Sequence, residues 1–270
     1  MDHEPHSGDA HPPREIARKV ESLGVAKART DTLTLLVLAV LAGAFIALGA
    51  LLFLVVTTDP RLGFGVSRLV GGASFSLGLI LVVIAGAELF TGNNLLAMAW
   101  ASRLIGTRAL ARNWLLAYVG NVVGSLGTAL LATWAGVAAL ASGAVGETAI
   151  RVASTKADLA LGVAFTRGVL CNALVCLAVW LAMGGRTVTD KILAIVFPIT
   201  AFVALGLEHS IANWFFLPFG WALGPQGAVP IAGALRNLVA VTAGNIVGGT
   251  LLVAAVYWLA YLRDGHDKPA

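Results

Sequence analysis

Apolar residues run through most of this chain in six long stretches, and nearly all the charged residues lie between them. The stretches cover residues 32–58, 69–87, 113–146, 159–184, 192–207 and 237–262. A helix needs about 20 apolar residues to cross the ~30 Å hydrocarbon core of a membrane. The pattern therefore predicts an all-α polytopic membrane protein with six transmembrane helices in a single domain, residues 31–262.

The composition supports this prediction, because 58% of the residues are hydrophobic and only 12% are charged. A soluble domain carries about 25% charged residues and needs them to cover its surface. Residues 1–30 are polar and contain several prolines, which predicts a tail with an amphipathic segment. Residues 263–270 are expected to form a second, shorter tail.

Lysine and arginine are distributed unequally between the two sides that six crossings define. One side carries 12 of these residues and the other carries 5, with Arg167 inside a stretch. The richer side is the cytoplasmic one by the positive-inside rule, so both termini are expected in the cytoplasm. The net charge of +4 then reflects topology, and no nucleic-acid partner is expected.

Two of the stretches are interrupted before they are long enough to cross. The second has 19 uncharged residues before Glu88, and the fifth has 16 before Glu208 and His209. Each of these spans, helices two and five, is predicted to be a half-helix, a loop and a second half-helix, broken at the membrane midplane. Because lipid-exposed loops are not tolerated at that depth, the loops must be lined by protein or by a pore.

Short sequence matches indicate an internal repeat. Asn, Gly, Asn and Gly recur with identical spacing in 113–124 and 237–248, and the pattern Glu-x₄-Asn occurs in 88–93 and 208–213. The halves, about residues 31–140 and 158–262, have three spans each, so they are predicted to cross the membrane in opposite directions as a 3+3 inverted repeat. Such repeats with broken helices are typical of transporters, and the breaks mark the substrate path.

Motifs of other activities are missing from the sequence. It has no His-Glu-x-x-His or Gly-x-Ser-x-Gly segment and no metal-ligand spacing, so no enzymatic activity, metal or cofactor is expected. Cys171 and Cys176 lie five residues apart in an apolar stretch and are interpreted as core residues. A water or glycerol channel would carry Asn-Pro-Ala at both breaks, and neither break has it.

Four segments, taken together, resemble the formate/nitrite transporter family. They are Glu88–Asn93, Gly168–Ala182, Glu208–Asn213 and Gly244–Gly249, and the resemblance extends from about residue 16 to residue 263. The resemblance implies a homopentamer of aquaporin-like protomers, embedded in the lipid of the cell inner membrane. It also implies that each protomer has its own pore for small monovalent anions of weak acids, such as formate or nitrite.

His209 is the main candidate for a functional residue. It stands at a predicted midplane break, where an ionisable side chain is functional by default, and imidazole titrates near neutral pH. The resemblance implies that His209 is the central histidine of the pore. It further implies that Thr91, on the other loop, bonds His209 or the substrate, and that Asn172 lines the same chamber.

Polar residues beside the breaks are expected to support the loops. Burying a carboxylate is costly unless it is paired or hydrogen-bonded, so Glu88 and Glu208 are expected to accept backbone N–H groups, a role favoured over a direct proton relay. Asn93 and Asn213 are expected to satisfy loose backbone groups as well. Arg167 either pairs or snorkels within the bundle, or it draws anions towards the pore.

The apolar constrictions are assigned from the resemblance, because aromatic and aliphatic residues at helical spacing would otherwise be interpreted as core. Phe75 and Leu79 lie four residues apart on one helix face, and Phe202 lies in the matching half-helix. The resemblance implies that these three form the periplasmic constriction. It implies that Leu89 and Phe90 form the cytoplasmic one.

A histidine between two apolar constrictions suggests how an anion crosses. A bare anion loses several kcal/mol of hydration there, whereas protonating a carboxylate costs about 1.36 kcal/mol per pH unit above its pKa, roughly 4 kcal/mol at pH 7. The hypothesis is proton-coupled passage with His209 lending the proton. The alternative is an anion channel in which His209 stays charged or only forms hydrogen bonds.

The choice of substrate is less clearly encoded than the pore. The segment Phe75–Leu79 resembles formate-transporting members of the family, which favours formate. The segment Phe165–Asn172 looks more like nitrite-transporting members. Nitrite is therefore the alternative, and hydrosulfide and lactate are left open.

Overall fold

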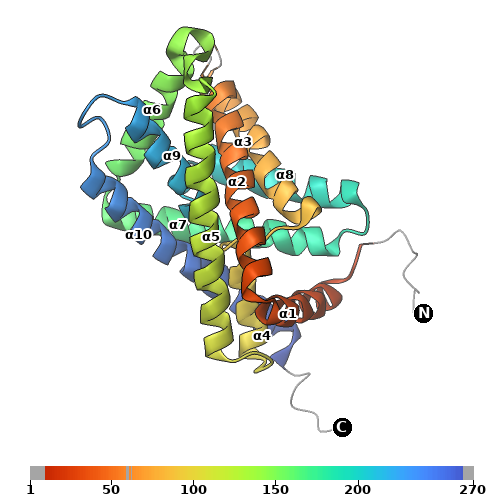
Figure 1. The fold of residues 1–270 in the computed structure, drawn as a ribbon. Helices are drawn as coiled ribbons and strands as arrows, with labels where there is room; N and C mark the ends of the chain where they lie inside the picture. Colours follow the sequence, from red (N-terminus) through yellow and green to blue (C-terminus); the bar gives the residue numbers. More distant parts are fainter. Residues whose placement is uncertain (1–9, 59–60, 62, 264–270) are drawn as a thin grey trace, which may run out of the picture.

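The computed structural model describes residues 10–58, 61 and 63–263, which fold into a bundle of helices (Figure 1). In this described part, five helices are long and apolar enough to cross a membrane: Thr32–Val56, Phe64–Gly86, Thr107–Trp134, Leu161–Gly184 and Ile231–Tyr261. The prediction of an all-helical fold with several membrane-spanning helices is thus confirmed. The fifth predicted span is built from two shorter helices: α8 (Val188–Ala204), which contains most of the fifth stretch, and α9 (Ser210–Leu223), which follows it.

Part of the N-terminal tail is helical. α1 (Pro13–Arg29) lies across the lower end of α2 (Thr32–Val56) in Figure 1. Its buried side chains follow helical spacing and include Ile16, Ala17 and Val20, while its polar side chains are mostly exposed, as an amphipathic segment requires. The rest of the two predicted tails, residues 1–9 and 264–270, lies outside the described residues.

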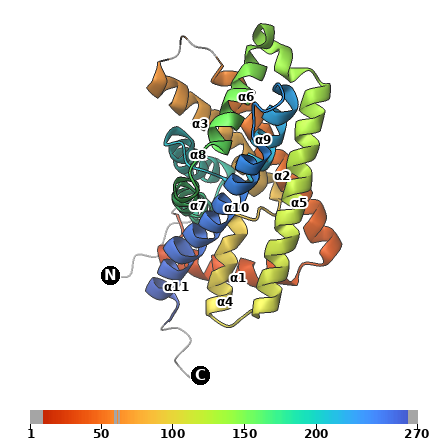
Figure 2. The ribbon, with the colours of Figure 1, turned by 90° about the vertical axis from the view of Figure 1, so that its left-hand side faces the viewer.

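The third predicted stretch, residues 113–146, does not form one helix in the structure. α5 (Thr107–Trp134) ends well before Gly146, and a short turn, η3 (Val137–Gly143), leads into a separate helix, α6 (Ala144–Ala157). Gly136 and Gly143 flank this turn with φ of 68° and 92°, which glycine adopts without strain. The apolar pattern missed α6 because the helix carries charged residues. α1 and α6 lie at opposite ends of the molecule (Figures 1 and 2).

Both predicted interruptions are non-helical in the structure. α3 (Phe64–Leu81) continues as a π-helical turn, η1 (Val82–Gly86), and helical structure resumes at η2 (Gly92–Leu96) and α4 (Ala97–Ala101). Gly86 and Gly206 end the two preceding helices with φ of 83° and 70°. We call residues 87–91 the first loop and residues 205–209 the second loop.

Glycines let two pairs of helices approach to backbone contact. A Cβ atom added at Gly124 of α5 would lie 2.0 Å from the carbonyl oxygen of Val40 on α2. A Cβ added at Gly248, where α10 (Ile231–Val247) ends, would lie 2.0 Å from the carbonyl oxygen of Val169 on α7 (Leu161–Gly184). Small residues at helix contacts allow such close packing in membranes. This packing requirement accounts for part of the high glycine content of the chain.

The glycine contact between α2 and α5 leads to a test on stability. We expect Gly124→Ala to destabilise the fold by about 1–3 kcal/mol or more, because two helix backbones must move apart to make room. Gly127→Ala, on the same helix, is the control, because a Cβ there meets no atom within 4 Å. Thermal unfolding of the purified protein in detergent measures both. Equal stability of the two variants would contradict the packing argument.

Candidate functional site

The two loops meet at a buried hydrogen bond. Thr91 of the first loop and His209 of the second loop are 0% and 3% exposed, and Thr91 Oγ1 lies 3.0 Å from His209 Nε2. The ring of Phe202 stacks on the imidazole, with the ring centroids 6.0 Å apart. The structure thus brings together Thr91 and His209, which the sequence analysis assigned to the same chamber.

The contacts of His209 fix which ring nitrogen carries the proton. Its Nδ1 accepts a hydrogen bond of 3.1 Å from the backbone N–H of Ala212 and so caps the N-terminus of α9. A neutral imidazole has one acceptor and one donor nitrogen, so the proton lies on Nε2. Nε2–H therefore donates to the hydroxyl oxygen of Thr91. Adding a proton at Nδ1 would break the cap of α9.

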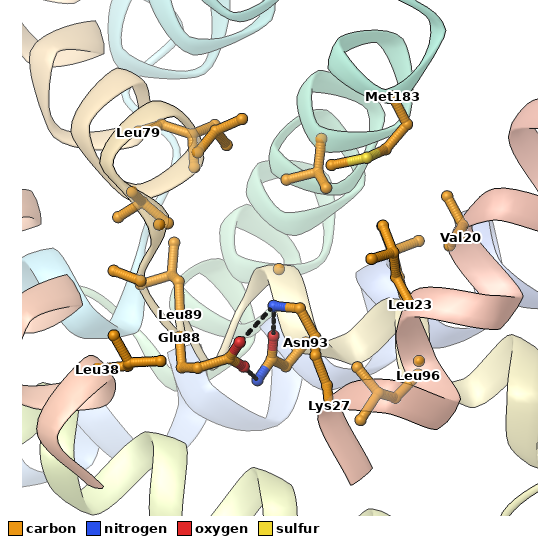
Figure 3. Close-up of a pocket in the computed structure, with 18 residues that line it drawn as sticks. Val20, Leu23, Lys27, Leu38, Leu79, Glu88, Leu89, Asn93, Leu96 and Met183 are labelled. Carbon is orange, nitrogen blue, oxygen red and sulfur yellow. Dashed lines mark hydrogen bonds and ion pairs between the residues drawn. The ribbon is translucent and has the colours of Figure 1, made fainter. Parts of the chain in front are cut away.

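Glu88 is paired and hydrogen-bonded rather than alone. Its carboxylate lies 3.0 Å from Lys27 Nζ on α1 and accepts a 2.7 Å bond from Asn93 Nδ2 (Figure 3). Asn93 also accepts from Lys27 Nζ at 2.9 Å and donates to Asn113 on α5 at 2.9 Å. The two oxygens of the carboxylate therefore face a lysine and an amide, which offsets the cost of burying the charge.

Glu208 has the same set of partners from the other half of the chain. Its carboxylate lies 2.9 Å from Lys156 Nζ on α6 and accepts a 2.7 Å bond from Asn213 Nδ2. Asn213 donates in turn to Asn237 on α10 at 2.8 Å. Both carboxylates accept from side chains rather than from the backbone N–H groups that the sequence analysis expected.

The backbone of each loop is held by an asparagine from a neighbouring helix. Asn121 on α5 accepts from the N–H of Phe90 at 2.8 Å and donates to the carbonyl of Glu88 at 2.9 Å. Asn245 on α10 accepts from the N–H of Ser210 at 2.9 Å and donates to the carbonyl of Glu208 at 3.0 Å. Buried backbone groups that the helix breaks leave free are satisfied in this way.

A cavity adjoins each loop. The Glu88 cavity has a volume of about 310 Å³, and apart from Lys27, Glu88 and Asn93 its lining is apolar, with Leu79, Leu89 and Met183 among the residues that Figure 3 labels. The Glu208 cavity has a volume of about 270 Å³ and includes His209 in its lining. The linings of the two cavities also include four buried apolar side chains that are 2–3% exposed: Phe75, Leu79, Leu89 and Phe202.

The apolar residues of the predicted constrictions are divided differently between the two sides. Phe75 and Phe202 line the Glu208 cavity, with their rings edge to face at 5.5 Å. Leu79 was grouped with them, but it lines the Glu88 cavity together with Leu89. Phe75 and Leu79 are one helical turn apart, so the two cavities adjoin α3 one turn from each other.

Phe90 is also placed elsewhere than expected. Its ring packs edge-on against Tyr118 and Trp114 of α5, with centroid distances of 4.9 Å and 6.5 Å, and it belongs to the lining of neither the Glu88 nor the Glu208 cavity. Leu89 lines the Glu88 cavity, whereas the ring of the neighbouring Phe90 packs against α5 instead.

Asn172 lies behind the first loop rather than in the lining of either cavity. Its amide nitrogen is 3.2 Å from the carbonyl oxygen of Thr91, 2.7 Å from Asn94 Oδ1 and 2.7 Å from the carbonyl oxygen of Asn245. The residue was expected to line the chamber with His209. In the structure it instead joins the backbone of the first loop to α10.

Basic side chains gather on one side of the site. Among the described residues, the lining of the Glu208 cavity includes four of them: Arg68, Arg151, Lys156 and Arg167. The lining of the Glu88 cavity has one, Lys27. Arg167 thus lies where it can draw anions inwards, which fits the second of its two expected roles. Within the same residues, no three His, Cys, Asp or Glu side chains come together as metal ligands.

Lys27 and Lys156 are important site residues that the sequence analysis used only as topology markers. A signal for them exists in the spacing, because buried small or apolar residues of α1 and α6 recur at positions 129 apart, as in Ala17 and Gly146. The same shift of 129 relates Lys27 to Lys156. Apolar periodicity did not reveal this match, because both helices are rich in charges.

Broken helices that meet between two cavities define the protein as a helical membrane transporter or channel. Residues 14–259 match the family model described as formate/nitrite transporter. The chain belongs to this family.

Individual relatives and solved structures agree with this assignment. The chain is 40% identical to the formate channel FocA of Escherichia coli (strain K12), covering 93% of this chain and 95% of that protein. It is 37% identical to the nitrite transporter NirC of Salmonella typhimurium, covering 85% and 84%. The fold is similar to that of an FNT family ion channel, with a TM-score of 0.84, 34% identity and coverage of 91% and 98%. It is also similar to a pentameric formate channel with formate bound, with a TM-score of 0.80, 37% identity and coverage of 86% and 98%.

The two lysine–glutamate pairs differ in burial, and this difference leads to a test. The side chains of Lys156 and Glu208 are 14% and 4% exposed, whereas those of Lys27 and Glu88 are 31% and 10% exposed. We expect Lys156→Met to destabilise the protein by about 3–5 kcal/mol, because it leaves Glu208 charged and unpaired.

The equivalent change Lys27→Met is the matched control and is expected to cost less. Adding Glu208→Gln to Lys156→Met should recover part of the lost stability. Thermal unfolding in detergent at neutral pH measures all the variants. Equal losses at the two pairs, together with no recovery in the double variant, would contradict the assignment of a buried charge pair.

Proposed function

We propose that this protein transports formate across the cell membrane, through a pore in each protomer of a homopentamer. The observation that carries the proposal is the buried Thr91–His209 hydrogen bond between two cavities, because it places a neutral donor at the closed part of the path. The similarity to FocA and to the formate-bound pentameric channel supports formate and the assembly. The proposal includes no chemical conversion of the substrate, so the protein is proposed to be a transporter and not an enzyme.

The topology that we propose is six crossings arranged as two inverted halves. The repeated Lys–Glu–Asn contacts and the positions of α1 and α6 at opposite ends support it. The second half then begins with α6, near residue 144, rather than near residue 158. With both termini in the cytoplasm of an inner-membrane protein, the Glu88 cavity opens to the cytoplasm and the Glu208 cavity opens outwards.

The substrate crosses the constrictions as a neutral acid in this proposal. The apolar lining between the cavities offers an anion no replacement for its hydration, which costs several kcal/mol. For a weak acid with a pKa about three units below the ambient pH, protonation costs roughly 4 kcal/mol. Anions of strong acids lack this option, so the constrictions select weak acids. Phe75 and Phe202 form the outer constriction, and Leu79 and Leu89 form the inner one.

His209 acts here as a neutral hydrogen-bond donor. Its Nε2–H, now bonded to Thr91, is free to bond an oxygen of the substrate when the threonine hydroxyl turns away. Full loan of a proton would first require a charged imidazolium and so the loss of the Ala212 contact that caps α9. The geometry thus supports the hydrogen-bonding role that the sequence analysis left as an alternative to proton loan.

The asymmetry of the two cavities assigns a role to the basic side chains. Arg68, Arg151, Lys156 and Arg167 raise the local concentration of anions in the Glu208 cavity, as clefts lined by one sign of charge do. The Glu88 cavity has one lysine paired with one glutamate and lacks this excess. Anion capture is therefore stronger from the outer side.

Nitrite is the second candidate substrate. The similarity to NirC at 37% identity favours it, and nitrite is also the anion of a weak acid, which can use the same neutral path. Formate and nitrite are therefore compared directly in the test below.

The test is transport by the purified protein in liposomes that contain a pH-sensitive dye. We expect formate, and to a lesser extent nitrite, to acidify the interior with little electric current, while chloride gives background values. His209→Asn should keep most of the flux and its pH dependence, because asparagine supplies both a cap acceptor and an N–H donor. His209→Ala supplies neither and should transport poorly.

Other outcomes count against parts of the proposal. No flux with any anion would contradict the transport function itself. A large current carried by formate would contradict passage as the neutral acid. If His209→Asn abolishes the pH dependence while His209 remains functional in the wild type, the imidazole lends a proton and the hydrogen-bonding role is wrong.

A further inference from the structure

Phe90 links the path to an aromatic cluster outside it. Its neighbour Leu89 lines the Glu88 cavity, and its other neighbour Thr91 bonds His209. The ring of Phe90 itself packs against Trp114 and Tyr118 of α5. The ring contact of Phe90 is therefore one of the contacts that hold these two neighbours in place.

Tyr118 connects this cluster to the second half of the chain. Its hydroxyl oxygen accepts a 2.8 Å hydrogen bond from the indole N–H of Trp214 on α9 and lies 3.0 Å from the hydroxyl of Thr242 on α10. The Thr242 hydroxyl donates its own hydrogen to the carbonyl of Leu238 at 2.7 Å. The Tyr118 hydroxyl therefore donates to Thr242, and every donor of the chain from Trp214 to Leu238 is used.

The position of this chain of hydrogen bonds is significant. Tyr118 lies five residues after Asn113, and Thr242 lies five residues after Asn237, so the two residues occupy equivalent places in the two matching segments. The bond between them joins the halves at this shared position. Trp214 lies on α9 one helical turn after Ser210, the residue that directly follows His209. The same chain thus reaches from the first loop to the helix that His209 caps.

We propose that Tyr118 is a positioning residue that ties the first loop to α9 and α10 and so fixes the aperture beside the Thr91–His209 pair. This inference rests on the proposed transport of small weak acids. A firmly held first loop keeps Leu89 and Thr91 in place and lets formate pass faster than larger weak acids. Loss of the Tyr118 hydroxyl removes the tie to α9 and α10. The Tyr118 ring against which Phe90 packs then moves more easily, so the selectivity for size decreases.

The experiment compares acetate with formate in the liposome acidification assay. We expect Tyr118→Phe to raise the ratio of acetate flux to formate flux about fivefold, which corresponds to the loss of one hydrogen bond of about 1 kcal/mol. Trp214→Phe should raise the ratio similarly, and the double variant should show no further increase, because both changes break the same tie. Tyr257→Phe is the control, because the Tyr257 ring stacks on Trp180 in a different hydrophobic cluster from that of Phe90.

A second measurement does not depend on transport. Hydrogen exchange of the peptide covering residues 87–94 should be faster in Tyr118→Phe than in the wild type and unchanged in Tyr257→Phe. If the wild type moves no formate, the proposed function fails, and the exchange rate alone decides whether Tyr118 holds the loop. A wild-type flux ratio in Tyr118→Phe, additive effects in the double variant, or unchanged exchange at 87–94 each overturns the role of Tyr118.

Discussion

The constraint on which the structure depends is that the loop backbone and the buried carboxylate at each helix break need partners in an apolar interior. A buried N–H or carboxylate without a partner costs several kcal/mol, so each loop needs a complete set of contacts before the helices can stop there. Asn121 and Asn245 supply these contacts to the backbone, and Lys27 and Lys156 supply them to the carboxylates. Because these side chains supply the partners of the loops, the Nε2–H of His209 is available for the substrate in the proposed path.

The two loops have similar supports but different residues at their centres. By the shift of 120 that relates Glu88 to Glu208, Leu89 stands where the second loop has His209. In the proposed path, the first half thus contributes an apolar gate and the second half contributes a hydrogen-bond donor. The surplus of basic side chains in the Glu208 cavity adds a second difference between the sides. An asymmetric function is in this way built from two similar halves.

Much of this arrangement could be predicted from the sequence, because its main causes are local. Runs of apolar residues indicate spans, and a carboxylate after 16 to 19 of them indicates a break, as at Glu88 and Glu208. Features that depend on how segments meet were not predictable in this way. The charges of α6 hid it from an apolar pattern. The side on which Leu79 lies depends on one helical turn, and the place of the Phe90 ring depends on its contacts with α5. The partners of Asn172 depend on contacts between residues about 80 positions apart.

The central claim is that His209 remains a neutral donor because its Nδ1 is committed to the N-terminus of α9. The most direct test is the ¹⁵N solid-state NMR spectrum of histidine-labelled protein in lipid, with His209 assigned by comparison with His209→Asn. Across about pH 5–8, where free imidazole titrates, the account predicts one protonated nitrogen, Nε2, and one unprotonated nitrogen, Nδ1. A doubly protonated His209 within that range would contradict it.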